Sequence, residues 1–475
     1  MRVAFPWTSG LPWEAKTDSE SNAAPPVEFA LGVDGISLWL IVLSALLLVP
    51  AVLVSWNAIT DRPAAFYALM LVLQAGMIGV FAAQDILLFY VFFEFTLIPL
   101  FFMIGIWGGA DRRWAARKFF IFTLAGSVLT FLGLLFIVLA HKWLVPDAPL
   151  TFSIPTLTAG LQQAVGRSAD AARFWQMASP WVFLALFAGF AIKVPLFPFH
   201  SWLPLAHVEA PTAGSVLLAG VLLKIGSYGF LRFALPLVPA GALWAFHAVA
   251  ILAVIGIIYG ALLALAQDDI KKLVAYSSVS HMGFVTLGTF IASGLLRDYD
   301  NVDAARLGLQ GAMVQMISHG FVSGAMFSCV GVVYDRMHTR MIKDYGGVAN
   351  VMPWFAVFFV FFGMANSGLP GTSGFVGEFM VILASFQKHP YIAFIAALTL
   401  IIGAGYTLWL VKRVLYGEVA NSHVAELTDI NWREALVLGV FAAGTLALGV
   451  YPKPLTDLLE PSIAQLAMQL ATSKL

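Results

Sequence analysis

Six ionisable side chains lie inside long apolar stretches of this sequence, where an isolated charge is costly. They are Glu94, Lys193, Lys224, His281, His319 and Glu378. A formal charge at bilayer depth costs roughly 2.5–3.5 kcal/mol on insertion scales, so these groups must be paired, neutralised or hydrated. Acids, amines and imidazoles on separate segments are what a proton relay requires, because burial and neighbouring charges shift their pKa values. We therefore predict that this set carries protons through the interior of the protein.

Several of these side chains also have a simpler interpretation. Glu94 and Lys193 could form a buried structural ion pair. His281 and His319 could serve only as hydrogen-bonding residues, because Ser and Gln lie near both of them in the sequence. The other two members of the set, a lysine and a glutamate, have no such economical explanation.

The stretch from 183 to 212, FLALFAGFAIKVPLFPFHSWLPLAHVEAPT, departs from the pattern of an ordinary membrane helix. Three prolines follow Lys193 within a dozen residues. Proline removes a backbone donor and clashes with the carbonyl four residues earlier, so a continuous helix is unfavourable here. We predict a broken membrane helix that holds Lys193 in a hydrated cavity. His200 and His207, after the break, could line an access route from one side or could only cap loop carbonyls.

The composition is typical of polytopic membrane proteins. Of 475 residues, 60% are hydrophobic and 11% are charged, whereas a soluble domain averages about 25% charged residues. Lysine plus arginine equals aspartate plus glutamate at 26 each, so no basic surplus indicates a nucleic-acid partner. The single Cys329 excludes an internal disulfide, a cysteine-ligated iron–sulfur cluster and a cysteine-based zinc site. Any redox chemistry is therefore expected outside this chain.

Apolar stretches of about 20 residues predict twelve membrane-spanning segments. They lie near 36–56, 64–83, 86–107, 116–140, 179–206, 213–235, 241–266, 271–292, 307–334, 352–386, 391–416 and 432–451. These runs are continuously apolar, so we predict helices rather than the alternating strands of a barrel. We expect a loop before the first segment, a second long loop from Lys142 to Ser179, and a short amphipathic surface helix after Tyr451. Trp39, Trp56, Trp107 and Trp202, near segment ends, are expected to be interfacial anchors.

Lysine and arginine in the short loops predict the orientation. One side carries Arg62, Arg112, Arg113, Arg117, Lys118, Lys271, Lys272, Arg336, Arg340, Lys343, Lys412 and Arg413. The other side carries only Arg297, Arg306 and Lys388 in its short loops, with Arg232 at a helix end. We expect the first side to be cytoplasmic.

Two long segments are interrupted by Pro and Gly, the fifth (KVPLFPFHSWLP) and the tenth (NSGLPGTSGFVGEF). They lie five spans apart, and an odd separation gives them opposite orientations, which is the signature of inverted repeats with one broken helix each. We therefore predict an all-α polytopic membrane protein with two five-helix inverted repeats. The expected division is an extracytoplasmic loop at 1–35, a first helix at 36–63, repeats at 64–235 and 236–416, and a last helix and tail at 417–475.

Four long motifs resemble one family of membrane proteins. They are KVPLFPFHSWLPLAHVEAPTAGSVLLAGVLLKIGSYG, QDDIKKLVAYSSVSHMGFV, MVQMISHG and GLPGTSGFVGEF. In this order they are similar to the proton-translocating, antiporter-like membrane subunits of respiratory complex I (NADH:quinone oxidoreductase) and of Mrp-type cation/proton antiporters. The resemblance covers roughly residues 30–450.

The resemblance implies a role for each intramembrane residue. Glu94 and Lys193 would form the pair that governs proton affinity, and Lys224 would be the central relay residue. His281 and His319 would continue the hydrophilic axis along the membrane plane.

Glu378 would be the outlet group of that axis. A glutamate at this position is typical of one complex I chain in the family, whereas its sister chains L and N carry a lysine there. The resemblance therefore implies redox-driven proton translocation by a subunit of NADH:quinone oxidoreductase in a bacterial inner membrane. It implies no cofactor or metal in this chain, with NADH, FMN, iron–sulfur clusters and quinone in partner subunits. The expected partners are other membrane subunits, especially chains L and N, and lipid, but no nucleic acid.

Three other functions are alternatives to this one. An Mrp-type Na⁺/H⁺ antiporter subunit, or the pump module of a related membrane-bound hydrogenase, would use the same residues. A structural scaffold would not need lysines and glutamates at the midplane. Members of the complex I branch usually have fourteen membrane helices. The resemblance begins in the loop that precedes the third of these helices. We therefore expect the first two helices to be absent from this sequence and the two inverted repeats to be intact.

Overall fold

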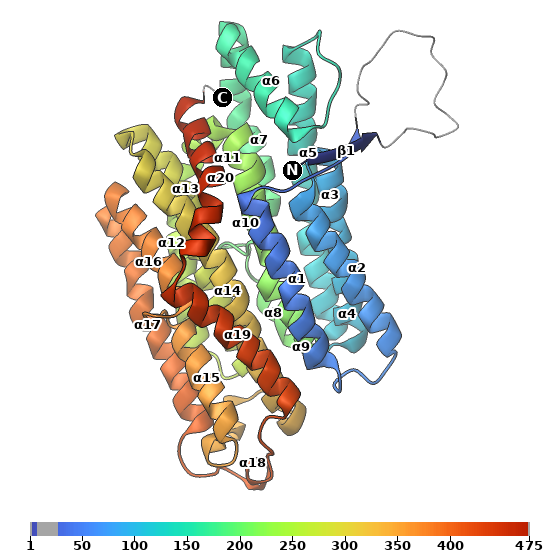
Figure 1. Cartoon of the computed structure of the whole chain (residues 1–475), viewed down its shortest axis with the longest axis vertical. Coiled ribbons are helices and arrows are strands. Elements are labelled where there is room, and N and C mark those ends of the chain that lie inside the picture. The colour runs from blue at the N-terminus through green and yellow to red at the C-terminus, as the bar shows by residue number, and fades with distance from the viewer. Residues whose placement is uncertain (1, 7–26, 474–475) are drawn as a thin grey trace.

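The computed structural model describes residues 2–6 and 27–473, most of which lie in helices packed side by side (Figure 1). The first part of the chain contains α1 (Gly35–Ser55), α2 (Pro63–Ala82), α3 (Ile86–Phe95), α4 (Leu97–Trp107), α5 (Arg112–Leu144), α6 (Ile154–Arg167), α7 (Ala169–Lys193) and α8 (Trp202–Glu209). One helical rod follows, made of α9 (Thr212–Leu217), the π-helical segment η1 (Leu218–Leu222), α10 (Leu223–Gly229), the π-helical segment η2 (Phe230–Ala234) and α11 (Leu235–Leu237). The remainder contains α12 (Pro239–Leu265), α13 (Ile270–Tyr299), α14 (Val302–Met337), the 3-10 turns η3 (Ile342–Asp344) and η4 (Val348–Asn350), α15 (Pro353–Asn366), α16 (Ser373–Lys388), α17 (Pro390–Leu415), α18 (Ser422–Ala425), α19 (Trp432–Val450) and α20 (Lys453–Thr472).

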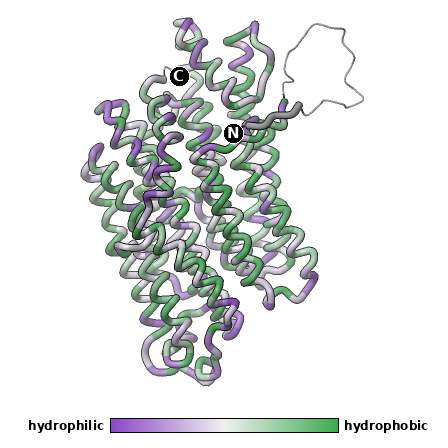
Figure 2. Tube along the Cα trace, in the orientation of Figure 1, coloured by the Kyte–Doolittle hydropathy of each residue, from purple (hydrophilic) through white to green (hydrophobic). Residues whose placement is uncertain are grey.

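This bundle confirms the predicted helical membrane fold. Among the described residues, eleven helical spans are long and apolar enough to cross a membrane, and α15 is a shorter apolar helix. The predicted tenth segment is the broken pair α15 and α16, separated by residues 367–372. Hydrophobic residues dominate the length of the helices, and hydrophilic residues gather at the two ends and in the connections (Figure 2).

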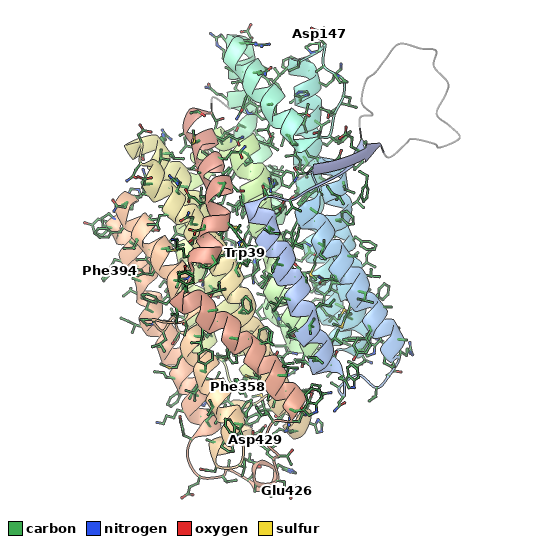
Figure 3. The ribbon with its side chains drawn as sticks, in the orientation of Figure 1. Trp39, Asp147, Phe358, Phe394, Glu426 and Asp429 are labelled. Carbon is green, nitrogen blue, oxygen red and sulfur yellow. The ribbon has the colours of Figure 1, made fainter. Side chains whose placement is uncertain are left out.

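The two ends of the bundle differ in what they carry. One end, which we name the terminal end, holds α6, the last turns of α20 and the loop with Asp147 (Figures 1 and 3). The opposite end, which we name the basic end, holds α18 and the loop with Glu426 and Asp429. The connections that carry most of the loop lysines and arginines also lie at the basic end.

Three spans form the centre of the bundle, and they carry three of the six candidate residues, Lys224, His281 and His319. In the rod from Thr212 to Leu237, in α13 and in α14, the most apolar part of each helix is wholly buried by its neighbours. The outer spans bury only about half or less of the same part and leave the rest for lipid. Polar side chains in the three central helices therefore need partners within the protein.

The predicted fifth segment is broken, as the prolines indicate. Helix α7 ends at Lys193, and α8 begins nine residues later at Trp202. The indole of Trp202 is 1% exposed and donates a hydrogen bond from Nε1 to Ile192 O at 2.9 Å. The prediction that Trp202 is an interfacial anchor is wrong, because its ring fills the break and holds the last turn of α7.

Two connections predicted as loops contain regular structure. Strands β1 (Arg2–Pro6) and β2 (Glu28–Gly32) pair antiparallel, while residues 7–26 of the predicted loop lie outside the described residues. The connection from Lys142 to Ser179 contains α6 and the start of α7. A search for continuous apolar runs misses α6 because it is amphipathic, burying residues on one face only.

The predicted amphipathic helix after Tyr451 is present and longer than expected. Helix α20 buries one stripe of residues, Leu455, Leu459, Ile463, Leu466 and Ala467. It packs along α14 and α1, where Ser462 Oγ accepts a hydrogen bond from the first amide of α1, Gly35 N, at 2.9 Å.

Close packing of α14 against α16 depends on Gly377. A Cβ atom on Gly377 would lie 2.6 Å from Gln315 N and 2.7 Å from Gln315 Cα, which are backbone atoms that cannot move independently. The absence of a side chain therefore sets how closely Glu378 approaches α14.

We expect Gly377→Ala to force α14 and α16 apart and to destabilise the protein by about 1–3 kcal/mol, as overpacking does in well-packed cores. The measurement is the midpoint of thermal unfolding of the purified protein in detergent. Gly405→Ala in α17 is the matched control, since nothing lies within 4 Å of the added Cβ there. Equal midpoints for the two variants would contradict this account of the helix contact.

Candidate functional site

Lys224 and His319 form a direct contact at the centre of the bundle. Lys224 lies on α10 and is 0% exposed, and its Nζ is 2.7 Å from Nδ1 of His319 on α14. The preceding π-helical segment η1 shifts the backbone hydrogen bonds, so that Leu223 N–H donates to Leu218 O. Lys224 Nζ also donates to Ala219 O within that segment. A lysine ammonium has only donors, so His319 accepts at Nδ1 when Lys224 is charged.

A second contact joins His281 on α13 to Glu378 on α16. His281 Nδ1 is 2.6 Å from Glu378 Oε1, and His281 Nε2 is 3.3 Å from Asn366 Oδ1 at the end of α15. Both ring nitrogens face oxygen atoms, so the ring can donate a hydrogen bond from either nitrogen. Gln315 Nε2 donates to the same Glu378 oxygen at 3.0 Å. The carboxylate thus has two donors in a site where its side chain is 3% exposed.

One gap separates these two contacts. The rings of His281 and His319 are 5.8 Å apart between centroids and are inclined at 55°. His319 Nε2 is buried and has no hydrogen-bond partner among the described residues. Buried polar atoms of this kind are usually satisfied by ordered water. Four of the six predicted residues therefore form one buried row across α10, α14, α13 and α16, with a single gap between the two imidazoles.

Lys193 and Glu94 are near each other but are not in contact. Lys193 is 3% exposed, and its Nζ lies 4.3 Å from the ring centroid of Phe93 and 3.4 Å from Thr96 Oγ1. Phe93 and Thr96 flank Glu94 on the neighbouring span, but no ion pair within 4.0 Å joins the lysine to the carboxylate in the described part of the chain. The buried ion pair weighed as an alternative is therefore not formed in this conformation.

The span that carries Glu94 is itself interrupted beside that residue. Helix α3 ends at Phe95 and α4 begins at Leu97, with Thr96 between them. Pro99 has no amide hydrogen to donate to the carbonyl of Phe95, which accounts for the irregular turn. Glu94 Oε1 is buried there without a hydrogen-bond partner among the described residues.

The two histidines after the break differ in environment. His207 on α8 is 0% exposed, and its ring stacks on Phe327 at 4.5 Å between centroids. Neither of its ring nitrogens has a hydrogen-bond partner within the described residues, so of the two alternatives for His207, capping a loop carbonyl does not occur in this structure. His200 is also buried and lies against the rings of Phe197 and Tyr259.

Some members of this site were not predicted individually. Gln315 lies one turn before His319 in MVQMISHG, and Asn366 lies directly before the break SGLPG, so both are polar residues beside a predicted feature. Asn366 Nδ2 also lies 3.3 Å from the hydroxyl of Tyr406, which is 0% exposed on α17. Tyr406 has no signal in the sequence, because tyrosine is common in membrane helices.

Two residues predicted as loop charges are bound to the end of α8. Lys271 is 8% exposed and donates from Nζ to Val208 O at 3.4 Å and to Ala210 O. Arg340 donates to Val208 O at 2.6 Å and pairs with Asp269 at 3.3 Å. These cations satisfy carbonyls at the C-terminal end of a short helix, where positive charge is favourable.

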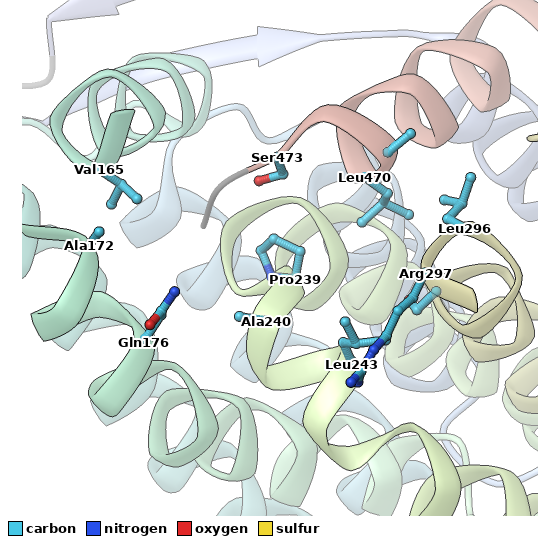
Figure 4. Close-up of a pocket in the computed structure, with 12 residues that line it drawn as sticks. Val165, Ala172, Gln176, Pro239, Ala240, Leu243, Leu296, Arg297, Leu470 and Ser473 are labelled. Atoms are coloured by element: carbon cyan, nitrogen blue, oxygen red, sulfur yellow. The ribbon is translucent and has the colours of Figure 1, made fainter. Parts of the chain in front are cut away.

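A hollow at the terminal end lies apart from the buried row. Its wall includes Gln176 on α7, Pro239 on α12, Arg297 on α13 and Leu470 on α20 (Figure 4). None of the six predicted residues lines it. The candidate site is therefore the interior row rather than this surface hollow.

Comparisons with known proteins identify the family and the fold. Residues 83–403 match the family described as NADH:quinone oxidoreductase/Mrp antiporter, TM. The chain is 47% identical over 450 residues to NADH-quinone oxidoreductase subunit M of Rhodobacter capsulatus, which covers 93% of this chain and 82% of that protein. A chain of respiratory complex I from Thermus thermophilus, solved with bound NADH, has a TM-score of 0.81 and 33% identity, with 93% of this chain and 86% of that chain covered. A chain of the Mrp complex from a Dietzia species shares the fold at a TM-score of 0.75 and 20% identity, with 94% and 86% covered.

The contact between His281 and Glu378 can be tested by a double-mutant cycle. We expect Glu378→Gln, His281→Gln and the double variant to give a coupling energy of roughly 1.5–3 kcal/mol, the range for hydrogen bonds to charged groups. The measurement is the unfolding free energy in detergent.

An exposed pair provides the control cycle. Arg62 and Asp61 are 3.7 Å apart with side chains 70% and 69% exposed, and such pairs couple by less than about 1 kcal/mol. A coupling between His281 and Glu378 no larger than that of the exposed pair would contradict the buried contact.

Proposed function

The chain belongs to the NADH:quinone oxidoreductase/Mrp antiporter family, and we propose that it is the M-type, proton-translocating membrane subunit of an NADH:quinone oxidoreductase. The identity of 47% to a subunit M over nearly the whole chain supports this assignment. Glu378 supports it as well, because a glutamate rather than a lysine ends the row of buried residues.

The observation that carries the proposal is that row itself. Lys224, His319, His281 and Glu378 come from four helices and lie in the buried interior, with contacts of 2.7 Å and 2.6 Å at its two ends. A bundle that needed only stability would gain nothing from this arrangement, because burying charges costs more than apolar packing of the same volume. Groups that exchange protons are the economical explanation.

The geometry supports a specific order of proton transfer. Lys224 in its ammonium form gives a proton to His319 Nδ1, and His319 releases one from its unpartnered Nε2. A water in the gap between the imidazole rings passes this proton to His281. Protonated His281 is stabilised by Glu378 until the carboxylate takes the proton and releases it onward. The proton affinity of each group in the row depends on the charge of the group that follows it.

Lys193 and Glu94 control this row from the neighbouring span. With the two side chains apart, Glu94 offsets the field of the Lys193 ammonium only in part, and the remaining field favours loss of the Lys224 proton. When Lys193 moves to pair with Glu94, Lys224 can be reprotonated. Moving one charge against about 100 mV takes roughly 2.3 kcal/mol, which one such rearrangement in a site of low polarity can supply.

The energy for this cycle comes from outside the chain. In this proposal NADH, FMN, the iron–sulfur clusters and quinone bind to other subunits, and quinone reduction there shifts charge along the row. The enzyme activity is that of the complex, and no redox step is assigned to this chain. The neighbours would be other membrane subunits, with the antiporter-like chains L and N on either side, in a bacterial inner membrane with the basic end facing the cytoplasm.

A second function uses the same residues. An Mrp-type Na⁺/H⁺ antiporter subunit would exchange protons for sodium without redox input, and the Dietzia chain shares this fold. Its identity of 20% is well below the 47% to the Rhodobacter subunit M, so we place this function second. Sodium-dependent proton transport by the complex in the absence of NADH would favour it.

We expect Lys224→Met to reduce NADH-driven proton uptake by about 10²-fold, because the variant has no group that can accept or give a proton at the start of the row. The measurement is proton uptake by inverted membrane vesicles, with NADH oxidation and assembly of the complex recorded in the same preparation. Glu94→Gln is expected to impair pumping as well.

The control variant is Lys453→Met, which removes an exposed lysine at the start of α20 and should pump normally. Full pumping by an assembled Lys224→Met complex would exclude the proposed row as the proton path.

A further inference from the structure

A ladder of polar side chains leads from Lys224 toward the terminal end. Lys224, Tyr228 and Arg232 follow one another at spacings of four residues along the rod from Thr212 to Leu237. Side chains four residues apart lie on the same face of a helix. Arg232 Nε donates to Tyr228 Oη at 3.1 Å, and Tyr228 Oη donates to Phe81 O at 3.0 Å.

The ladder ends in an ion pair beside a polar hollow. Arg232 Nη2 is 2.6 Å from Asp34 Oδ2, at the N-terminus of α1. Lys224 and Tyr228 are 0% exposed, whereas the side chains of Arg232 and Asp34 are 17% and 34% exposed. Both members of the pair line a hollow that is bordered mainly by residues of α6 and α20. Its polar lining includes Thr158 and Gln162 of α6, Gln465 and Gln469 of α20, and Gln84 from the connection between α2 and α3. The pair therefore separates the central lysine from water at the terminal end.

Neither Arg232 nor Tyr228 can pass a proton in this arrangement. A guanidinium keeps its proton at any physiological pH, so Arg232 is a permanent positive charge. The hydroxyl proton of Tyr228 is already committed to Phe81 O, and the ring is packed against Phe81 and Phe89. A fixed cation in a narrow path repels protons and other cations, as it does in selective channels.

Asp34 holds the guanidinium in place. Its Oδ1 accepts a hydrogen bond from Ser37 N at 2.9 Å, in a capping box at the start of α1. Burial opposes ionisation of Asp34, but the charge of Arg232 and the hydrogen bonds from Ser37 outweigh it and lower its pKa. A carboxylate with a lowered pKa stays charged at neutral pH, and its stabilising contribution is lost only in acid.

We propose that Arg232, held by Asp34 and Tyr228, is a fixed-charge seal that prevents protons from returning to Lys224 from the terminal end. A row of groups that exchange protons easily would otherwise be open to back-leak, because the hollow brings water to within two helical turns of Lys224, roughly 12 Å along the rod. This inference rests on the proposed function, since a seal is needed only if Lys224 exchanges protons.

The test measures passive proton leak without NADH. The assembled complex carrying Arg232→Gln is reconstituted in liposomes, a pH gradient is imposed, and its decay is followed with a pH-sensitive dye. We expect the gradient to decay about tenfold faster than with the native complex, because the partly buried positive charge of Arg232 no longer opposes proton passage. Arg306→Gln is the matched control, because Arg306 also forms an ion pair near the terminal end, with Glu460, but lies off the ladder.

Arg232→Lys provides a second measurement if the glutamine variant does not assemble. Lysine keeps the charge and can pair with Asp34, but an ammonium can release its proton, as a guanidinium cannot. We expect a leak that rises with pH in this variant and no such rise in the native complex. Asp34 and Tyr228 are the titratable groups in contact with this position, and both are unchanged.

The results separate this inference from the proposed function. A native-like leak at every pH in the assembled Arg232→Gln or Arg232→Lys complex would overturn the seal while leaving pumping through Lys224 intact. If the seal is correct, the double variant Lys224→Met, Arg232→Gln should leak less than Arg232→Gln alone. If the double variant leaks equally, protons pass without Lys224 and the seal does not protect the row.

Discussion

Every ionisable group inside this bundle has to find its partner within the protein, because lipid offers none. The three enclosed spans satisfy this constraint, since Lys224 meets a histidine on α14 and Glu378 meets a histidine on α13. Both contacts join a lysine or a glutamate to an imidazole, whose two ring nitrogens can each donate or accept a hydrogen bond. The same four residues that satisfy the constraint on burial are those that exchange protons in the proposed function.

The two pairs of ionisable residues differ in this structure in whether their side chains are in contact. His281 and Glu378 are in contact, whereas Lys193 and Glu94 are apart, with the lysine held against an aromatic ring and a hydroxyl. Helix breaks accompany both sites: α7 ends at Lys193, and α15 ends at Asn366. A broken helix leaves backbone groups without intrahelical partners and makes room for water and side-chain movement. The separation of one pair and closure of the other is what a cycle of charge displacement requires at an intermediate stage.

The sequence was sufficient for the spans and for the identity of the ionisable residues, but not for their pairing. A lysine or glutamate within an apolar run can be identified from the sequence alone. Burying its charge is costly whichever way the side chain is oriented, so its presence there indicates a specific role. Which partner it meets depends on helix rotation and on close approaches such as that at Gly377, which no local pattern encodes. For this reason Asn366, Tyr406 and the Arg232–Asp34 pair came only from the structure. The same limit explains Trp202, whose position near a segment end was correct while its burial in the break was not.

The π-helical segments of the central rod bring a consequence for how this chain can change over evolutionary time. A π-helical turn holds one more residue than an α-helical turn, so η1 acts as a local insertion ahead of Lys224. Deleting one residue from η1 would restore regular α-helical bonding and leave the residues after it nearly in phase, so Lys224 would stay close to His319. A deletion in a regular α-helical turn removes no extra residue and would rotate everything after it by about 100°. The length of this rod can therefore change at its π-helical segments, whereas a change elsewhere along it would separate contacts such as that of Arg232 with Asp34.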